Sequence, residues 1–191
     1  GISPDITIDA LYAFTDCEVS ISPNACVIVD KKPQFLSVKD LLAIATENTK
    51  ELLKRELEIK LAELQEKWHY TSLEKIFFEE KIYKELEKKH ETWEKVLQSI
   101  DKAFNPFKKQ LKREITKEDI IKLTEKPVRR IYRLDIDELN EQIRNLEAEI
   151  KKVKHDLANL VDYAVAYFEN LLKKYGKGRE RKTEIKLFDV I

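Results

Sequence analysis

LNEQIRNLEAEIKKVKHDLANLVDYAVAYFENL, residues 139–171, is the stretch that decides the fold. Its apolar residues recur in alternating steps of four and three without interruption: Leu139, Ile143, Leu146, Ile150, Val153, Leu157, Leu160, Ala164, Tyr167 and Leu171. Such a heptad seam winds a helix left-handedly around a partner helix, because 3.5 residues fall just short of one natural turn. A helix of this length is about 50 Å long, and one narrow apolar stripe does not stabilise it alone. It therefore needs a second helix.

The partner that the sequence offers is the stretch 37–68. Ser37, followed three residues later by Asp40, is a good helix start. Its apolar residues are Val38, Leu41, Leu42, Ala45, Leu52, Leu53, Leu57, Leu61, Leu64 and Trp68. Thr49 and Glu56 break a strict seam, so the register of the pair stays open. Because the two stretches flank a compact segment, they are expected to run antiparallel.

That compact segment, residues 69–136, shows several shorter helical patterns. The apolar spacing predicts one helix over Leu73–Leu86 and another over 90–104, which Asn105-Pro106 then stops. Thr116-Lys-Glu-Asp119 caps a third helix that runs through Leu123. These patterns predict a small helical head.

The two ends of the chain are expected to form a base. Residues 6–14 have helical spacing, and Ala25–Val29 and Pro33–Leu36 read as two short strands around a tight turn. At the other end a glycine cap follows Tyr175, and an alternating pattern after Thr183 predicts an added edge strand.

The predicted fold class is mainly α. It is a long antiparallel two-helix coiled coil with a small helical dimerisation head at one end and a small α/β base, containing a short β-hairpin, at the other. The expected boundaries are 1–36 for the base (together with 175–191), 37–68 for the first shaft helix, 69–136 for the head, 137–174 for the second shaft helix and 175–191 for the return segment.

Composition narrows the function classes. The 191 residues include 36 basic and 36 acidic side chains, so the chain has no net positive charge that would attract it as a whole to nucleic acid. Any DNA contact must therefore be local. Cys17 and Cys26 are too few for a disulfide scaffold and indicate a reducing compartment, the cytoplasm. No apolar run approaches the ~20 residues that cross a bilayer, so no membrane partner is expected. The absence of Met predicts a piece of a longer protein.

No catalytic or metal-binding constellation is visible in the sequence. His69, His90 and His155 have no partners at metal-ligand spacing and are expected to be solvated helix residues. There is no glycine-rich phosphate loop. Cys17 and Cys26 have no histidine partner and are expected to pack. We therefore expect no catalytic residue and no metal ligand here.

Two stretches are candidates for binding. The first runs from Pro127 to Ile136, and its apolar side chains fit either a core or an isologous two-fold contact: Pro127, Ile131, Tyr132, Leu134 and Ile136. The second is the basic tail, residues 173–182. Its cations fit either a solvated helix end or a local phosphate contact through Lys177, Arg179, Arg181 and Lys182.

Three motifs resemble a known family. The first motif lies near the start of the chain and has four parts: Leu11-Tyr12, Glu18-Val-Ser-Ile, Ala25-Cys-Val-Ile-Val-Asp-Lys-Lys-Pro-Gln and Leu36-Ser-Val-Lys-Asp-Leu-Leu. The second motif is Leu123-Thr-Glu-Lys-Pro-Val-Arg-Arg-Ile-Tyr-Arg-Leu-Asp-Ile. The third motif is Tyr175-Gly-Lys-Gly-Arg-Glu-Arg-Lys-Thr-Glu-Ile. In this order, with shafts of matching length, they resemble the A subunit of the bacterial type IIA topoisomerases, topoisomerase IV more than gyrase. The resemblance covers the end of the tower, the coiled coil and the C-gate.

The resemblance implies a mechanical role. The parent enzyme changes DNA topology by ATP-dependent double-strand passage, and this region would supply the shaft and the exit gate (C-gate), dimerising through the head. The partners that it implies are DNA and the B subunit. It also implies a catalytic tyrosine upstream of this chain, and Mg²⁺ and ATP bound elsewhere, with no cofactor here. The sequence departs from the family at Tyr132, where leucine is usual, and at Leu139-Asn-Glu-Gln.

Two other function classes remain open from the residues. One is a stand-alone coiled-coil module that binds another protein and has no DNA role. The other is a nucleic-acid-binding arm that uses the basic tail. Self-association of the chain separates the gate from the module, and salt-dependent binding to duplex DNA would indicate the arm.

Overall fold

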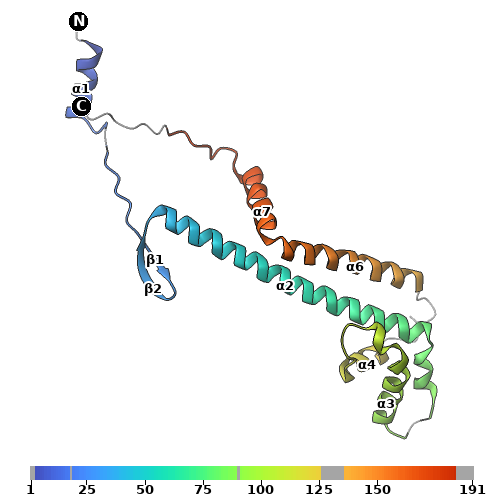
Figure 1. Cartoon of the computed structure of the whole chain (residues 1–191). Coiled ribbons are helices and arrows are strands. Elements are labelled where there is room, and N and C mark those ends of the chain that lie inside the picture. The colour runs from blue at the N-terminus through green and yellow to red at the C-terminus, as the bar shows by residue number, and fades with distance from the viewer. Residues whose placement is uncertain (1–2, 18, 90, 126–135, 184–191) are drawn as a thin grey trace. The chain divides into compact units, whose positions relative to one another are not determined.

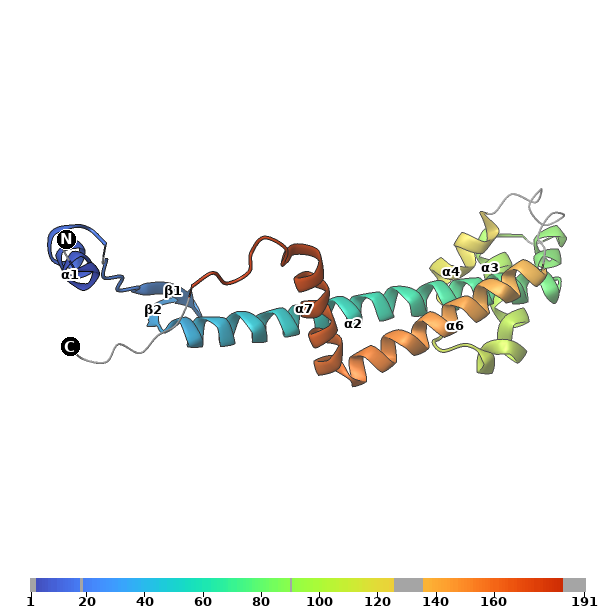
Figure 2. The same cartoon turned by 90° about the horizontal axis from the view of Figure 1, so that it is seen from above.

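The computed structural model describes residues 3–17, 19–89, 91–125 and 136–183, and two views show its elements (Figures 1 and 2). In chain order these are α1 (Pro4–Phe14), β1 (Ala25–Val29), β2 (Lys32–Leu36), α2 (Val38–Glu79), the 3₁₀ helix η1 (Ile82–Glu87), α3 (Trp93–Phe104), the 3₁₀ helix η2 (Asn105–Gln110), α4 (Lys117–Thr124), α6 (Ile136–Ala158) and α7 (Leu160–Tyr175). The predicted fold class, mainly α with a small β-hairpin, is confirmed.

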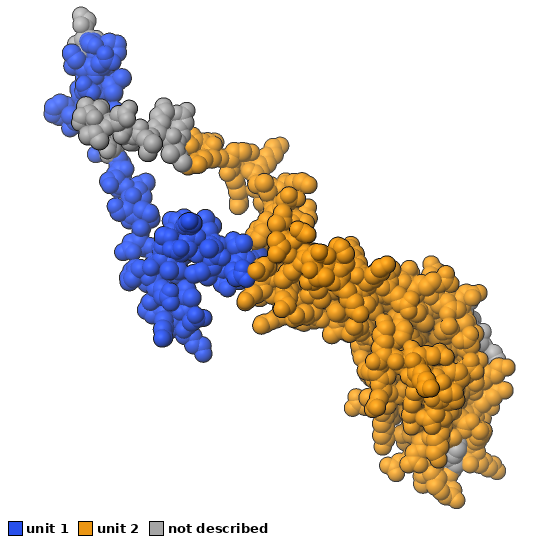
Figure 3. All heavy atoms as spheres, in the orientation of Figure 1, with its two compact units in different colours: residues 1–49 blue, residues 50–191 orange. Residues whose placement is uncertain are grey.

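The chain divides into two compact units, residues 1–49 and 50–191 (Figure 3). In the first unit β1 pairs antiparallel with β2, from Ala25 opposite Leu36 to Val29 opposite Lys32. Asp30 and Lys31 form the two-residue turn with φ of 51° and 64°, the left-handed backbone that suits a tight hairpin. The predicted helix and hairpin are thus confirmed. The proposed base of 1–36 with 175–191 stays a prediction, and its edge strand lies largely beyond the described residues.

The two cysteines do not pack as expected. Cys17 and Cys26 are exposed and free. Among the described residues of the first unit no side chain is fully buried, so the unit has no core into which a thiol could pack. The expectation that these cysteines are packed is wrong for this reason.

In the second unit, α2 and α6 lie side by side and antiparallel (Figures 1 and 2). Their shared core is a group of buried side chains: Leu57, Leu64 and Trp68 of α2 with Ile150 and Val153 of α6. Leu57 lines one groove with Val153, while the Trp68 indole N–H donates to Glu147 Oε1 over 3.1 Å. From the first contact to the second, the residue number increases along α2 and decreases along α6, so the two helices run in opposite directions. The predicted antiparallel pair is therefore confirmed for this part of the shaft.

The predicted uninterrupted helix over 139–171 is broken at Asn159. α6 ends at Ala158 and α7 begins at Leu160, and Asn159 has φ −116° and ψ 48°, outside the helical region. Its side-chain amide donates to the His155 carbonyl over 3.0 Å. Asparagine weakens helices because its side chain competes for backbone hydrogen bonds in this way. The heptad pattern therefore predicted the seam but not its continuity.

The head has its own core, built on the last two turns of α2. Its buried side chains are Leu73, Ile76, Phe77, Phe78, Ile82, Leu97, Ile100, Phe104, Ile120 and Leu123. The separate helix expected over Leu73–Leu86 is wrong, because α2 continues to Glu79 and η1 follows. No glycine or proline lies between Trp68 and Leu73 to end the first helix there. The predicted stop at Asn105-Pro106 is confirmed, since α3 ends at Phe104.

Candidate functional site

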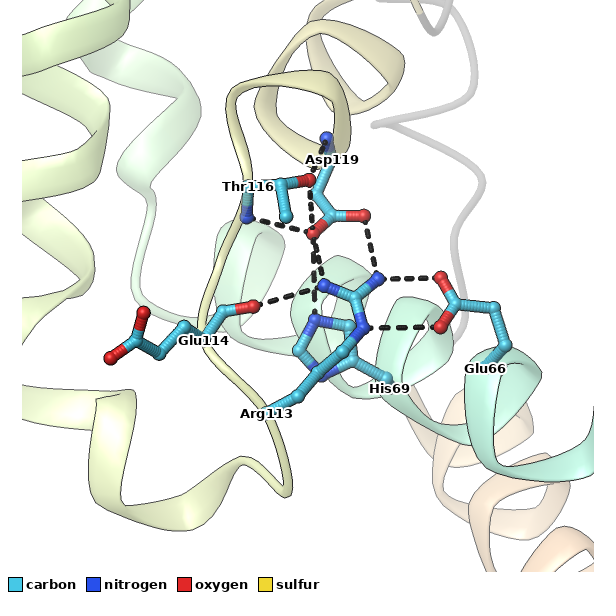
Figure 4. Close-up of polar contacts among 6 residues, drawn as sticks. All are labelled: Glu66, His69, Arg113, Glu114, Thr116 and Asp119. Carbon is cyan, nitrogen blue, oxygen red and sulfur yellow. Dashed lines mark hydrogen bonds and ion pairs between the residues drawn. The ribbon is translucent and has the colours of Figure 1, made fainter. Parts of the chain in front are cut away.

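A polar cluster joins the head to α2 (Figure 4). α2 contributes Glu66 and His69, the segment before α4 contributes Arg113, and α4 contributes Asp119 with its cap Thr116. We call residues 111–116, which cross α2 at this point and lead into α4 (Figure 4), the strap. The cluster combines charged side chains from elements that lie far apart in the sequence.

Arg113 is the centre of the cluster. Its Nε donates to Glu66 Oε2 over 3.1 Å, and its Nη2 donates to the other oxygen of the same carboxylate. Toward α4, Nη1 donates to Asp119 Oδ2 over 2.7 Å and Nη2 to Asp119 Oδ1 over 3.0 Å. Nη1 also donates to the Glu114 carbonyl over 2.9 Å. The guanidinium thus uses its full set of donors and bridges two carboxylates in a forked geometry.

Asp119 is the buried member of the bridge. Besides Arg113, it accepts hydrogen bonds from the Thr116 backbone N–H and hydroxyl, both over 2.9 Å. In return the Thr116 hydroxyl accepts from the Asp119 backbone N–H, which completes a capping box. Burial opposes ionisation of Asp119, but the hydrogen bonds from Arg113 and Thr116 outweigh it and hold the pKa of the carboxyl well below its ordinary value.

His69 lies against this bridge and is only 1% exposed. Its Nε2 is 3.7 Å from Asp119 Oδ2, and neither ring nitrogen has a hydrogen-bond partner among the described residues. Burial, together with the charge of Arg113, lowers the pKa of His69 despite the nearby carboxylates. The expectation of a solvated histidine is wrong here, because the strap covers this face of α2. A signal was present: His69 stands four residues before Leu73 and seven before Ile76, on the face that enters the head core.

Trp68 connects the strap to α6. Its ring is buried among the shaft residues while its N–H bonds Glu147 of α6. The Lys112 ammonium lies 3.9 Å from the ring centroid, a cation–π contact from the residue next to Arg113. Further along, the Tyr70 hydroxyl donates to the Lys122 carbonyl of α4 over 3.3 Å. The strap and α4 therefore contact successive positions along α2.

The residues predicted to form the dimer contact are mostly beyond what the structure describes. Pro127, Ile131, Tyr132 and Leu134 lie outside the described residues. Ile136 is the first residue of α6 and is 36% exposed. The two-fold contact therefore stays a prediction.

The basic tail is described as far as Thr183. The helix ends at Tyr175, the Gly176 N–H donates to the Leu172 carbonyl, and Gly178 has φ +81°, so the predicted glycine ending is confirmed. The four cations proposed to contact DNA are all exposed: Lys177, Arg179, Arg181 and Lys182. Exposure fits either a solvated end or a phosphate contact, so the DNA contact stays a prediction.

The described part of the chain has neither a candidate metal site nor a candidate membrane span. No three histidine, cysteine or acidic side chains in it come close enough together to hold a metal ion. Nor does it contain a helix whose length and apolar character would suffice to span a membrane.

Comparison with known proteins decides the family. The family of the DNA gyrase/topoisomerase IV A subunit matches residues 1–169. The chain belongs to this family. It is a region of a type II topoisomerase A subunit, as the three sequence motifs predicted.

Individual relatives agree with this assignment. The chain is 34% identical over 187 residues to the A subunit of DNA topoisomerase 4 from Borreliella burgdorferi, which covers 98% of this chain and 30% of the relative. It is 33% identical over 69 residues to the A subunit of DNA gyrase from Lawsonia intracellularis, covering 36% of this chain and 8% of the relative. The chain thus spans less than a third of the length of these curated relatives.

The polar cluster should make the stability of the chain depend on pH. Unfolded His69 titrates near 6.5 and the folded residue at a lower pH, so the unfolded state takes up the proton first as the pH falls. Stability that is fully present above pH 6.5 is therefore lost below it, by at most about 1.4 kcal/mol per pH unit. Glu66 and Asp119, whose pKa values are lowered from 4.5 and 3.8, add their own loss only in more acidic solution.

Urea unfolding at pH 7.5 and 5.5 measures this loss. We expect His69→Gln to flatten the dependence between these two values, because the variant lacks the buried side chain whose pKa is lowered by folding. An equal pH dependence in wild type and His69→Gln would show that His69 is not the titrating group.

Proposed function

We propose that this chain is the coiled-coil and exit-gate (C-gate) region of a type II topoisomerase A subunit, in an enzyme that changes DNA topology by ATP-dependent double-strand passage. The observation that carries the proposal is a shaft of two antiparallel helices, 50–79 of α2 with α6, joined to a separately packed head in a chain of this family. In this role two heads meet and form the gate through which the transported duplex leaves.

The physical properties of the described parts support such a role. The shaft between α2 and α6 has one apolar core and the head has another, so each part resists deformation on its own. A gate also needs a contact that can open and reseal, and we expect the stretch from Pro127 to Ile136 to provide a modest one. The shaft would then hold this contact away from the centre where DNA is cut.

In this proposal, other parts of the enzyme carry out its chemistry. We infer that the catalytic tyrosine lies upstream of this chain, that Mg²⁺ and ATP are bound elsewhere, and that the intact A subunit has DNA and the B subunit for partners. The 191-residue chain alone should therefore have no topoisomerase activity. Its own expected property is self-association, which the stand-alone module does not require.

Equilibrium sedimentation of the chain tests the proposal. We expect a dimer, and we expect the double variant Leu134→Asp, Ile136→Asp to be monomeric, because two buried charges would face their copies across the two-fold axis. Leu52→Asp is the matched control, since Leu52 is 64% exposed on α2. A wild-type chain that stays monomeric at high concentration would overturn the gate, and a double variant that still dimerises would place the contact elsewhere.

A further inference from the structure

We propose that Trp68 is a positioning residue for the shaft: its indole N–H, bonded to Glu147, selects the register in which α6 lies on α2. The apolar pattern of the two stretches leaves this register open. In the structure the indole N–H donates to Glu147 Oε1 over 3.1 Å. The inference concerns contacts within one chain, and only its consequence for the gate rests on the proposed function.

The apolar core of the shaft does not fix the register by itself. Hydrophobic burial is non-directional, so any register that returns apolar side chains to the seam is favourable. From residue 143 to residue 160 the apolar side chains form two rows that repeat every seven residues: Ile143, Ile150 and Leu157, and Leu146, Val153 and Leu160. A slide by seven residues is therefore the smallest that again brings both rows to face Leu57 and Leu64 of α2. It moves α6 by about 10 Å along the shaft.

Trp68 adds a directional contact to this core. The residue is 7% exposed and packs with the buried side chains of the shaft. Its ring nitrogen can only donate a hydrogen bond, and a buried donor without an acceptor costs free energy. Glu147, an exposed residue of α6, supplies a charged acceptor, which makes a stronger hydrogen bond than a neutral group does. A single polar contact within an apolar seam can specify the register of a coiled coil.

The registers one heptad away place other side chains opposite Trp68. A slide of α6 toward the head brings Lys154 to the place of Glu147, and a slide in the opposite direction brings Asn140 there. Lysine donates and does not accept, so Lys154 leaves the indole N–H without a partner. It would also add a second cation beside Lys112, whose ammonium lies 3.9 Å from the centroid of the Trp68 ring. Asn140 offers only a neutral acceptor. Of these three positions, 147 alone carries a carboxylate.

A fixed register gives the shaft a single length. α2 runs without interruption into the head core, through Leu73 and Phe77, so the head moves with α2. α6 is then the element whose position along the shaft depends on the seam. In the proposed exit gate, a slide by one heptad would change the distance over which the shaft holds the head by about 10 Å. The contact of Trp68 with Glu147 would prevent this change.

The distance between two spin labels, one on each helix, reports the register. Lys54→Cys on α2 and Arg144→Cys on α6 are exposed positions, and both lie in the second compact unit. Seen from Lys54, Arg144 lies beyond the Trp68 contact, so the label distance runs mainly along the shaft and changes with a slide. Cys17 and Cys26 are replaced by serine. Labelled chains are diluted with unlabelled chains, so that only distances within one chain are measured.

The decisive variant moves the carboxylate by one heptad. Glu147→Lys with Lys154→Glu keeps the composition of α6 and places the acceptor at position 154. We expect a second population whose label distance is longer by about 10 Å, because the slide that pairs this acceptor with Trp68 moves α6 toward the head. Glu141→Lys with Lys151→Glu makes the same exchange at two exposed positions and should keep the single distance of wild type. The wild-type distance alone in the first exchange variant would overturn the proposal.

Trp68→Phe separates the hydrogen bond from the packing. Phenylalanine keeps an aromatic ring in the seam but has no N–H, so nothing at this position selects the carboxylate. We expect the displaced population to rise about tenfold over that of wild type, the effect of losing a hydrogen bond to a charged group. In this background the exchange at positions 147 and 154 should not move the distances further. A shift as large as with Trp68 present would mean that another donor selects the carboxylate, which overturns the role of Trp68.

These outcomes are separate from those of the gate. A chain that stays monomeric in sedimentation would overturn the gate, while the label distances would still decide whether Trp68 selects the register. A dimer whose register is unmoved by the exchange would remove the role of Trp68 and leave the gate standing. If circular dichroism shows that Trp68→Phe does not fold, the exchange variant, which leaves the apolar core unchanged, decides the question alone.

Discussion

Replacing Phe104 with alanine should lower the free energy of unfolding of the head by about 3–5 kcal/mol, the range for large aromatic truncations in a packed core. Phe104 is fully buried at the end of α3. Its ring stacks on Phe77 of α2, with centroids 6.3 Å apart and an interplanar angle of 15°. The neighbours are fixed on separate helices, so the core cannot collapse into the space that the ring leaves. Urea unfolding followed by circular dichroism measures the loss.

Phe35→Ala is the matched control for this prediction. Phe35 lies in β2 and is 71% exposed, so its truncation should change stability by less than about 0.5 kcal/mol. Whole domains are stable by only about 5–15 kcal/mol, so Phe104→Ala removes a large share of what holds the head folded. If Phe104→Ala cost no more than Phe35→Ala, the stacked core between α2 and α3 would not exist in solution.

The sequence predicted where the shaft residues meet because burial follows helix periodicity. The positions Leu57, Leu64, Ile150 and Val153 are spaced to share one face, and they share one core. The same reasoning missed the break at Asn159, since an apolar period says nothing about a side chain that competes for the backbone. It also ended the first helix too early. Up to Trp68 the apolar residues of α2 pack against α6, and from Leu73 they pack into the head core, but the helix itself continues through this change to Glu79.

In the polar cluster, too, the sequence predicted a contact between residues that are close in the chain but not one between residues that are far apart in it. Thr116 and Asp119 lie three residues apart, and their spacing alone predicts the cap that the structure contains. The pair of Glu66 and Arg113 lies 47 residues apart in the chain. With 36 acidic and 36 basic side chains, no local pattern selects this pair from the others. Only the position at which the strap crosses α2 brings the two side chains together.

Asp119 is the residue of this cluster whose loss should cost most. Asp119→Ala removes the buried carboxylate that neutralises Arg113 and that accepts two hydrogen bonds from Thr116. The Arg113 that remains is 34% exposed and still bonded to Glu66, so the loss is that of the helix cap and of the hydrogen bonds to a charged group, about 2–4 kcal/mol. We expect a loss in this range, measured by urea unfolding at pH 7.5, where His69 is neutral in both states and adds nothing.

Two further variants separate charge from shape at this position. Asp119→Asn keeps the size and one acceptor oxygen, so it should lose less than alanine, about 2 kcal/mol, the contribution of hydrogen bonds to a charged group. Glu118→Ala is the control, because Glu118 precedes Asp119 in the same first turn of α4 but is exposed, and its loss should not exceed about 1 kcal/mol. Equal losses in Asp119→Ala and Glu118→Ala would mean that both carboxylates act only on the helix dipole. In that case Arg113 would not be held by α4.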